Sequence, residues 1–566
     1  MSILIFYYCM RKKEADFIKQ YSYLRQILKL STEELKKSNW DYNISLRDAK
    51  RSGAVISLAE STCIRMIEQI AGIDLHKNLG KFEKIRTELR ELRKEKRSKE
   101  VENRIKLLYS ALNEIQFVPE YICLVCNSNK DFLRACKGFK VNGMTYQRFV
   151  GTTGGVKNST VVFVAEYTRN GAELLEELRR RADNGRRIDK EFVPAKLEAY
   201  RALICSASTP LSMPKGVLVV DDCVVHFNSD YILLKDSPTG EPSMEVIKNG
   251  DVELIDSDGY GLMSPALAMR WQEELQLDYL PSGLCLRNSF CKGMAFTFDF
   301  HEFASSIPQK DTAVDIWGNK HEINEIELIL TASMLKLWDS YANIDDYLQN
   351  CAANGYTFSA TKVTPKELDK ERRLNYQFIQ SYDLSDDEIN ELVSPTLHEL
   401  SDAMGDDYYR TLLFLRGTGI TEKNAFSGDF DWVTALQADR RMLGDPFVRN
   451  QIKTLIKKKV NESKFGKVKV EGNFSVICGD PIALCQSIWG LPVTGLLKAG
   501  ELYNRYWHDK GADDVVCFRA PMSNHNNIRK MKIHRSDEAN YWYRYMNTVT
   551  LLNCHDMTCH ALNGAD

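Results

Sequence analysis

Residues 256–265 read DSDGYGLMSP, and residues 281–293 read PSGLCLRNSFCKG. The first segment is a turn signal that carries two carboxylates. The second segment places Arg287 and Lys292 near one end of a strand, and its final glycine allows another backbone to approach closely. Cations placed in this way suit a polyphosphate or a nucleic-acid backbone, although an ordinary hairpin has the same pattern.

The composition is that of a folded protein with several domains. The chain has 566 residues, which at roughly 150 per domain is about four units. Hydrophobic residues make up 44% and charged residues 27%, so several cores can be buried. The 75 basic and 77 acidic side chains give a net charge of −2, which excludes a globally basic nucleic-acid coat protein but leaves room for a local basic channel.

The start of the chain does not resemble a secretory signal. The apolar run MSILIFYYCM precedes Arg11, Lys12 and Lys13, whereas a secretory signal has its cations first. No uninterrupted apolar run of about 18 residues follows, so we expect no membrane span. The 15 cysteines are scattered and are expected to be reduced, which predicts a cytoplasmic protein.

The sequence alternates between blocks with a helical pattern and blocks rich in strand-forming residues. Residues 1–115 are predicted to be mainly helical, and the highly charged stretch 81–106 is predicted to be an exposed helix. Short apolar runs from Pro119 onward, and again over 200–310, are typical of strands in a barrel or a sandwich. Residues 320–445 again indicate helix, and a third strand-rich region is expected to begin near Lys453.

Two further segments carry chemistry with more than one interpretation. Residues 451–470 hold seven lysines and one glutamate, which suits either a surface facing phosphates or a solvated turn. Near the end, a group of thiols, imidazoles and one carboxylate could bind zinc, but alternation along a strand would point these side chains to both faces. The residues of this group are Cys554, His555, Asp556, Cys559 and His560.

The order of these motifs resembles that of a known family. DGYGLMSP is followed by PSGLCLR and CKG, then by FRAP at 518–521 and NGAD at 563–566. This order is similar to the core of the single-chain, two-barrel RNA polymerases, which include the RNA-dependent RNA polymerases of RNA interference and their bacterial and phage relatives. The resemblance spans residues 215–566.

The resemblance implies an α+β fold with two double-psi β-barrels, the second incomplete, joined by a helical connector. Together with the alternation of helical and strand-rich blocks, the resemblance predicts five parts. These are a helical N-terminal region (1–115), a slab-like region of strands and helix (116–195), a first barrel (196–315), a helical connector (316–445) and a second barrel cut at its catalytic loop (446–566).

The function implied by the resemblance is template-directed RNA synthesis from ribonucleoside triphosphates. The residues of the first two motifs are most similar to those of the RNA-dependent group, which favours RNA as the template. A phage-type polymerase that copies DNA is the alternative. A noncatalytic nucleic-acid-binding protein that has kept the barrels and lost the metal loop is a hypothesis of a different class. A bacterial or phage-infected cell is the expected setting, without a membrane partner.

The resemblance also assigns roles to five residues. Asp566 is similar to the first of three aspartates in a D-x-D-G-D loop that binds two Mg²⁺ ions, and the chain stops there, as expected of a fragment that is inactive by itself. Lys292, assisted by Arg287, would neutralise phosphate charge. Arg519 would contact the ribose hydroxyls of the incoming nucleotide. Lys336 would face the nucleic acid, or is a surface lysine.

Overall fold

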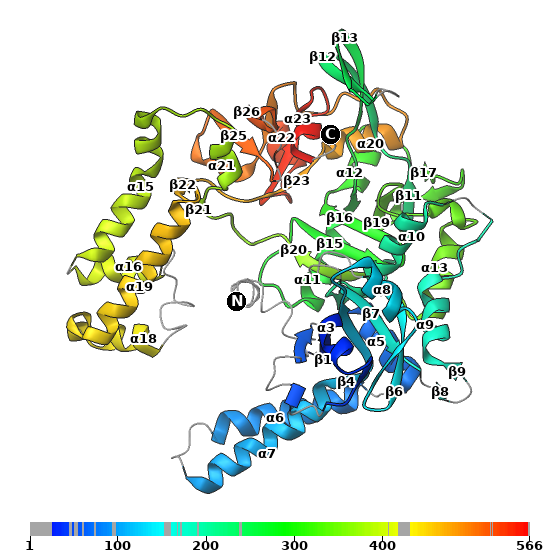
Figure 1. Cartoon of the computed structure of the whole chain (residues 1–566). Coiled ribbons are helices and arrows are strands. Elements are labelled where there is room, and N and C mark those ends of the chain that lie inside the picture. Colours follow the sequence, from blue (N-terminus) through cyan, green and yellow to red (C-terminus); the bar gives the residue numbers. More distant parts are fainter. Residues whose placement is uncertain are drawn as a thin grey trace.

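The computed structural model describes residues 25–44, 48–49, 55–58, 61–72, 75–92, 98–151, 160–166, 168–169, 172–189, 192–236, 240–405, 407–416, 431–520, 522 and 525–563. Four parts follow one another along the chain: an N-terminal sheet unit, a first barrel, an arm of helices and a second barrel (Figure 1). In this view the arm lies at the left, and the second barrel lies above the first.

A seven-stranded sheet in the order β2-β5-β6-β7-β4-β1-β3 forms the N-terminal unit. Its strands are β1 (Arg25–Ser31), β2 (Asp41–Tyr42), β3 (Val55–Leu58), β4 (Phe117–Val125), β5 (Phe139–Val141), β6 (Met144–Gly151) and β7 (Thr160–Ala165). The first three strands lie in the region expected to be helical. In β1, Leu28 and Leu30 are buried and Lys29 between them is less so, which is the period of two that suits a half-buried strand.

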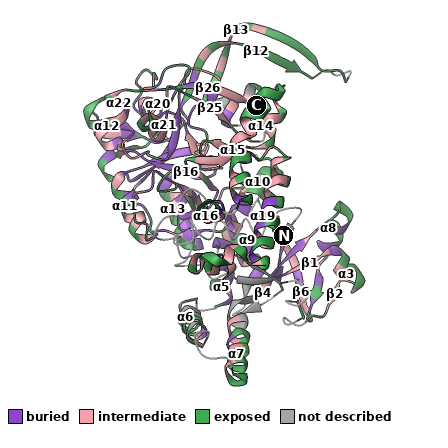
Figure 2. Ribbon diagram, turned by 90° about the vertical axis from the view of Figure 1, so that its left-hand side faces the viewer, coloured by how far each residue is buried: buried purple, intermediate pink, exposed green. Residues whose placement is uncertain are grey.

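The charged stretch expected to be one exposed helix contains parts of two helices, α6 (Leu75–Leu92) and α7 (Lys99–Gln116). They pack side by side through an ion pair of 2.6 Å between Arg104 and Glu88 and through the buried Leu89 and Leu108. The pair projects from the N-terminal unit, and most of the described surface of α7 is exposed (Figure 2).

The first barrel is a sheet in the order β10-β20-β15-β16-β14-β19-β11. Its strands are β10 (Thr209–Pro210), β11 (Val217–Val220), β14 (Tyr260–Met263), β15 (Gly283–Asn288), β16 (Cys291–Thr297), β19 (Leu328–Thr331) and β20 (Ser359–Val363). β11 runs parallel to β19, and β14 runs parallel to β16, while β14 and β19 are antiparallel.

The second barrel repeats this topology. Its sheet has the order β23-β27-β24-β26-β25, with strands β23 (Val476–Cys478), β24 (Glu501–Tyr503), β25 (Asp514–Phe518), β26 (Ile528–Ile533) and β27 (Val549–Leu552). The parallel pairs are β23 with β27 and β24 with β26, and β24 is antiparallel to β27. In both barrels, therefore, five strands numbered along the chain lie in the order 1-5-2-4-3 with the same directions.

Helices occupy equivalent places in the two repeats. After the second strand come α11 (Pro265–Glu274) and α21 (Arg505–Lys510), and after the fourth come α12 (Phe300–Ser306) and α22 (Asp537–Trp542). One hydrophobic core contains side chains of both barrels, including Phe296 and Phe303 of the first and Leu484 and Leu551 of the second. The predicted α+β fold with two β-barrels and a helical connector is therefore confirmed.

Two glycines of the motif region allow backbones to approach closely. A Cβ on Gly261 would lie 2.1 Å from the carbonyl oxygen of Ile329, and one on Gly293 would lie 2.5 Å from that of Gly259. Both distances are too short for any side chain. These positions therefore require glycine so that the neighbouring backbone segments of the first barrel can pack this closely.

Between the first and second strands of the first barrel lies a long insertion, the hairpin of β12 (Val224–Lys235) and β13 (Ser243–Ile255). It projects at the top of Figure 1. The remaining elements are α3 (Thr32–Lys37), α5 (Thr62–Ala71), α8 (Asn129–Ala135), α9 (Leu174–Asp183), α10 (Pro194–Arg201), α13 (Ile344–Asn354), α20 (Pro481–Ile488), α23 (Thr558–Asn563), the ribbons β8–β9 (168–173) and β17–β18 (312–322), and 3₁₀ turns at 202–205, 323–325, 338–340, 440–444 and 525–527.

The arm contains α14 (Tyr376–Gln380), α15 (Asp386–Met404), α16 (Tyr408–Arg416), α18 (Asp431–Ala438) and α19 (Pro446–Ser463), and the ribbon β21 (Glu371–Arg373) with β22 (Lys469–Glu471) joins it to the barrels. The expectation that strands begin near Lys453 is wrong, because this segment is α19. Val448, Ile452 and Ile456, four residues apart, form its buried face against α15 and α16. The second barrel therefore begins at β23 rather than at residue 446.

Candidate nucleotide-binding edge of the first barrel

The hairpin of β15 and β16 places two cations side by side. Arg287 and Lys292 are directly opposite each other in the antiparallel register, so their side chains lie on the same face. Lys292 is exposed, while Arg287 is half-buried and donates from Nη1 to the Leu286 carbonyl at 2.7 Å. Its Nε is buried without a partner among the described residues. The hairpin thus presents a free ammonium group beside a guanidinium group.

The segment after the fifth strand brings Lys336 to this hairpin. The backbone N–H of Lys336 donates to the Phe290 carbonyl at 2.8 Å, and the N–H of Lys292 donates to the Met334 carbonyl at 3.0 Å. Cys291 and Leu335 also form an isolated bridge. The hairpin and the segment are therefore held together by backbone hydrogen bonds, and the sequence-predicted residues Arg287, Lys292 and Lys336 belong to one cluster.

The electrostatics of the cluster follow from its burial. Burial lowers the pKa of Lys336, and the nearby Lys292 lowers it further, while Asp258 and Asp222 act in the opposite direction. A lysine whose pKa is lowered by burial and by a second cation gains from an anion that neutralises both charges. The edge therefore favours binding of a phosphate group.

Asp222, which the sequence did not single out, holds this segment in place. Its Oδ2 accepts from the N–H of Ser333 at 2.9 Å, and its Oδ1 accepts from the hydroxyls of Ser333 at 2.7 Å and Ser257 at 2.8 Å. Asp222 therefore joins the first strand to the segment that carries Lys336. The only sequence signal for it is its place two residues after the apolar run 217–220.

Arg519 occupies the equivalent hairpin of the second barrel. It directly follows β25, in the connection to β26, as Arg287 and Lys292 flank the connection between β15 and β16. Arg519 is exposed, and its Nη1 donates to the Leu562 carbonyl of α23 at 3.3 Å. Asn527 likewise donates to the Ala561 carbonyl at 3.3 Å. In both barrels, the third-to-fourth hairpin thus contacts the segment after the fifth strand.

Asp566 lies outside the described residues, as do the side chains of Cys559 and His560. In the part of the chain that the structure describes, no group of three or more His, Cys, Asp or Glu side chains could hold a metal ion. His555 Nε2 lies 2.7 Å from the Thr494 carbonyl, and Asp556 Oδ1 accepts from the Thr558 N–H at 2.7 Å. The described members of the suggested zinc group thus have structural hydrogen bonds.

A pair of buried aspartates joins the two barrels. Asp256 Oδ2 accepts from the backbone N–H of Asp480 at 2.9 Å. Asp480 accepts from Ile482 N–H at 2.9 Å, Leu496 N–H at 2.6 Å and the Tyr543 hydroxyl at 2.8 Å. Burial raises the pKa of the Asp256 carboxyl well above its ordinary value, and the neighbouring Asp480 raises it further. Asp256 has fewer donors around it than Asp480, so we expect it to be the member of the pair that is protonated first.

Asp256→Asn is therefore expected to remove a contribution to stability that decreases as the pH rises. The raised pKa means that native Asp256 stays protonated while the unfolded chain ionises, so the contribution of this residue to stability falls as the pH rises above about 4, by up to about 1.4 kcal/mol per pH unit, until the native pKa is reached. The asparagine lacks this loss and keeps the acceptor oxygen. Urea unfolding at pH 4 and pH 7 measures the free energy of unfolding of both proteins. The variant should become more stable relative to the wild type only at pH 7. An equal difference at both pH values would contradict the protonated state of Asp256.

The serines of the two motifs have structural roles. Ser264 caps α11 by accepting from the Leu267 N–H at 3.2 Å, and Pro265 takes the first helical position, where no N–H is needed. Ser282 accepts from the N–H and the hydroxyl of Thr548, both at 3.3 Å, just before β27. The two serines therefore stabilise the start of α11 and a contact between the two barrels.

The fold and this cation cluster define a protein of the two-barrel polymerase class. The family model described as RNA dependent RNA polymerase matches residues 121–549, which include the first barrel, the arm and the second barrel up to the start of β27. The chain belongs to this family.

Two relatives give the comparison in detail. The chain is 26% identical over 427 residues to the DNA-directed RNA polymerase YonO of Bacillus phage SPbeta, and the match covers 72% of this chain and 46% of the relative. A structural match to the RNA dependent RNA polymerase QDE-1 from Thielavia terrestris has a TM-score of 0.46 and 14% identity, and it covers 77% of this chain and 46% of the other. The chain thus spans about half the length of these relatives. None of the helices in its described part is long and apolar enough to cross a membrane.

Proposed function

We propose that this chain provides the two-barrel core of a polymerase that synthesises RNA from ribonucleoside triphosphates on a nucleic-acid template. The observation that carries the proposal is the cluster of Lys292, Lys336 and Arg287 on the first barrel of a chain that belongs to this family. Phosphate groups carry the negative charge in both the substrate and the growing strand, and a partly buried cluster of cations recognises that charge.

The proposed roles follow from position and charge. Lys292 and Lys336 neutralise phosphate oxygens of the incoming nucleotide or of the strand end, and Arg287 supports them with a planar fork of donors. Arg519, on the equivalent hairpin of the second barrel, hydrogen-bonds the ribose hydroxyls. Asp222 is a positioning residue, because it contacts the segment that carries Lys336 rather than the substrate.

RNA polymerases of this family generally use Mg²⁺, which stabilises the charge of the attacking and leaving oxygens when it is bound. The described residues do not provide a site for it. We propose that Asp566 is one carboxylate of that site. Since one carboxylate cannot hold a pair of ions, the 566-residue chain alone is expected to bind nucleotides without joining them.

A primed-template assay tests this expectation. The chain is incubated with Mg²⁺, the four ribonucleotides and a labelled primer on its template, beside a version extended with the two further aspartates of the D-x-D-G-D loop. We expect no extension by the first protein and template-dependent extension by the second. Extension by the 566-residue chain would overturn the role of Asp566, and its absence from both would favour a protein that only binds nucleic acid.

RNA is the proposed template, because the family that matches is named for it. A DNA template is the second candidate, and the observation that favours it is the relative YonO, whose name describes a DNA-directed enzyme. The extended protein, given single-stranded RNA and DNA templates of identical sequence, distinguishes the two by the rate of synthesis on each. Faster synthesis on DNA would reverse our choice.

Arg519→Ala is expected to weaken the choice of ribonucleotides over deoxyribonucleotides. The guanidinium can donate to the ribose 2′-hydroxyl, and losing a charged hydrogen bond costs about 1.5–3 kcal/mol, or roughly a tenfold to hundredfold drop in discrimination. The extended protein is assayed for kcat/KM with ATP and with dATP, and for template affinity. Equal losses for both nucleotides, or a matching loss of template affinity, would contradict the role.

A further inference from the structure

A groove of about 960 Å³ lies on the helical arm, between α14 and the second half of α19 with the turn that follows it. We call it the lysine groove. Its lining comprises Tyr376, Ile379, Gln380, Thr454, Lys457, Lys458, Asn461, Glu462, Lys464, Phe465, Gly466 and Lys467. It coincides with the lysine-rich stretch 451–470, which the proposed polymerase site does not use.

The cations of this groove have no acidic partners. Lys457, Lys458, Lys464 and Lys467 are exposed, and no ion pair to them occurs among the described residues. The lining contains one acid, Glu462, which lies 4.0 Å from Arg373. Four positive charges and one shared negative charge leave a strongly positive surface that an anion can neutralise.

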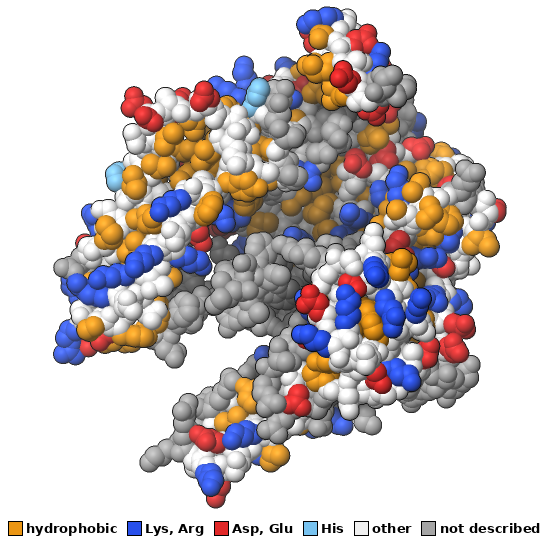
Figure 3. Space-filling view, viewed as in Figure 1, with side chains coloured by type: hydrophobic (Ala, Val, Ile, Leu, Met, Phe, Trp, Pro, Cys, Tyr) orange, Lys and Arg blue, Asp and Glu red, His pale blue; other side chains and the backbone are white. Residues whose placement is uncertain are grey.

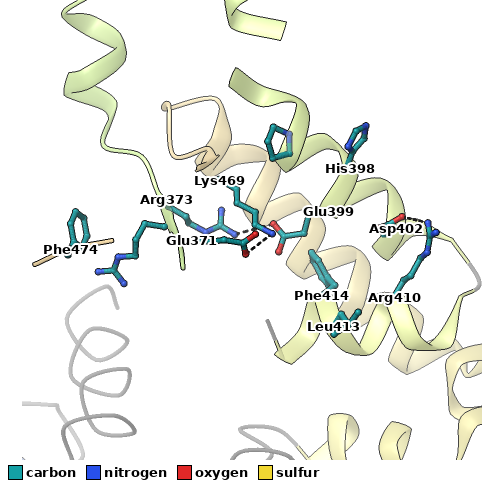
Figure 4. Close-up of a pocket in the computed structure, with 12 residues that line it drawn as sticks. Glu371, Arg373, His398, Glu399, Asp402, Arg410, Leu413, Phe414, Lys469 and Phe474 are labelled. Atoms are coloured by element: carbon teal, nitrogen blue, oxygen red, sulfur yellow. Dashed lines mark hydrogen bonds and ion pairs between the residues drawn. The ribbon is translucent and has the colours of Figure 1, made fainter. Parts of the chain in front are cut away.

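The neighbouring cavity at the base of the arm is different. There, Lys469 pairs with Glu371 at 2.9 Å, and Arg410 pairs with Asp402 at 2.5 Å (Figure 4). Its cations are therefore neutralised within the protein, and it offers no comparable attraction to an anion. The contrast shows that the lysine groove, unlike this neighbouring cavity, presents lysines that have no acidic partner in the described part of the chain.

Two aromatic rings accompany the lysines. Phe465 is 72% exposed and Tyr376 is 47% exposed. Gly466 has a φ of +75°, and a Cβ there would lie 3.2 Å from Tyr376 Cα and 2.9 Å from Ile379 Cδ1, so the turn packs closely on α14. Exposed rings on a packed base, flanked by lysines, suit the stacking of unpaired bases with contacts to their phosphates.

The other side of α14 contacts the second barrel. Phe378 packs against Phe518 with ring centroids 5.0 Å apart, and Gln377 Oε1 accepts from the Met522 N–H at 3.3 Å. Phe518 and Met522 flank Arg519. The lysine groove is therefore separated from the proposed ribose-contacting hairpin by one short helix, so a strand leaving that hairpin can reach it. Lys and Arg side chains are visible along the arm at the left of Figure 3, which has the same view as Figure 1.

We propose that the lysine groove binds a single strand of RNA, with bases stacked on Phe465 and Tyr376 and phosphates contacted by Lys457, Lys458, Lys464 and Lys467. The choice of RNA rests on the proposed function, because RNA is the product whichever template is copied. A single strand fits because the rings need unpaired bases, which a duplex does not offer.

The test measures binding of a fluorescent 12-nucleotide single-stranded RNA to the 566-residue chain by anisotropy, with EDTA present so that no synthesis contributes. Replacing the four lysines with alanine is expected to weaken binding at least tenfold at about 0.1 M salt. The slope of log affinity against log salt should fall by about 3, since each phosphate contact of a single strand contributes about 0.7. The control replaces four exposed lysines of the N-terminal unit, Lys99, Lys106, Lys130 and Lys140, and should change affinity less than twofold.

Phe465→Ala is expected to weaken binding at least fivefold without changing the salt slope, because it removes a stacking surface and no charge. Phe447→Ala near the start of α19, 59% exposed and outside the groove, is the matched control. Equal effects of the two lysine sets, or of the two phenylalanines, would overturn the proposal as nonspecific attraction. Tighter binding of single-stranded DNA or of duplex RNA, lost in the same variants, would overturn the choice of occupant.

Crosslinking locates the strand independently of affinity. RNA that contains 4-thiouridine should crosslink to the segment 447–471 in the wild type, and the crosslink should persist in the Lys292→Ala, Lys336→Ala protein. In the extended protein, loss of synthesis with the crosslink retained would support both the groove and the roles of Lys292 and Lys336. Unchanged synthesis with the crosslink retained would support the groove and contradict those roles. A crosslink found only on the barrels would overturn the lysine groove and leave the proposed function unaffected.

Discussion

Alanine at Lys292 or at Lys336 is expected to lower RNA synthesis by about a hundredfold to a thousandfold in a protein that carries the complete aspartate loop. Removing one preorganised donor from developing charge has an effect of this size in other enzymes. Lys336 is the stronger test, because it is half-buried and fixed by a backbone hydrogen bond to Phe290, so water replaces its ammonium group poorly. Single-turnover synthesis with saturating primer and template measures the loss.

Two comparisons make this result specific. Lys320→Ala removes an exposed lysine of the first barrel from β18, outside the cluster, and should leave the rate unchanged. In the 566-residue chain, the Lys292 and Lys336 variants should also bind ATP less tightly than wild type, whether or not synthesis occurs. A rate loss below threefold in both variants, or an equal loss with Lys320→Ala, would contradict a role in contacting phosphate.

The motif region of the first barrel was predictable from the sequence because its constraints are local. Gly293 was expected to allow a close approach of backbones, and the structure places the Gly259 carbonyl where its side chain would be. Arg287 and Lys292 were expected near a strand end, and they pair across one hairpin. Turn residues and glycines report on neighbours a few residues away, which a single sequence records.

The contacts that the sequence missed are those between residues that are distant along the chain. Asp222 contacts Ser333, and Asp256 contacts Asp480, at separations of 111 and 224 residues. These contacts exist only because the strands pair in the order 1-5-2-4-3 and the barrels share a core. No short tandem repeat in the sequence marks the two barrels as equivalent, so their relation is visible only in the pairing of the strands.

Local composition also misled the prediction in two places. The lysines of 451–470 obscured the four-residue spacing of Val448, Ile452 and Ile456, which is the signal for helix α19. In the N-terminal region, the short strands β1 and β3 are stabilised by pairing with each other and, for β1, with β4. Strand formation that depends on a partner about 90 residues away is weakly encoded in the strand itself.

The second large effect concerns stability rather than chemistry. Asp480→Ala is expected to lower the free energy of unfolding by about 3 kcal/mol or more, because it leaves the Ile482 and Leu496 N–H groups and the Tyr543 hydroxyl buried without an acceptor, at about 1–3 kcal/mol each. Urea unfolding followed by tryptophan fluorescence measures the change, since Trp489 and Trp542 lie in the shared core.

Asp445→Ala is the matched control, because Asp445 also precedes a proline at the start of a helix. It accepts from the Phe447 N–H at 2.9 Å and the Val448 N–H at 3.0 Å, but it lies on the partly exposed arm, where water can replace it. Loss of such a cap costs about 1 kcal/mol. If the two variants lost equal stability, Asp480 would be no more than a helix cap. A loss several times larger for Asp480→Ala would show that the buried carboxylate, through Ile482, Leu496 and Tyr543, stabilises the second barrel well beyond the cap of a single helix.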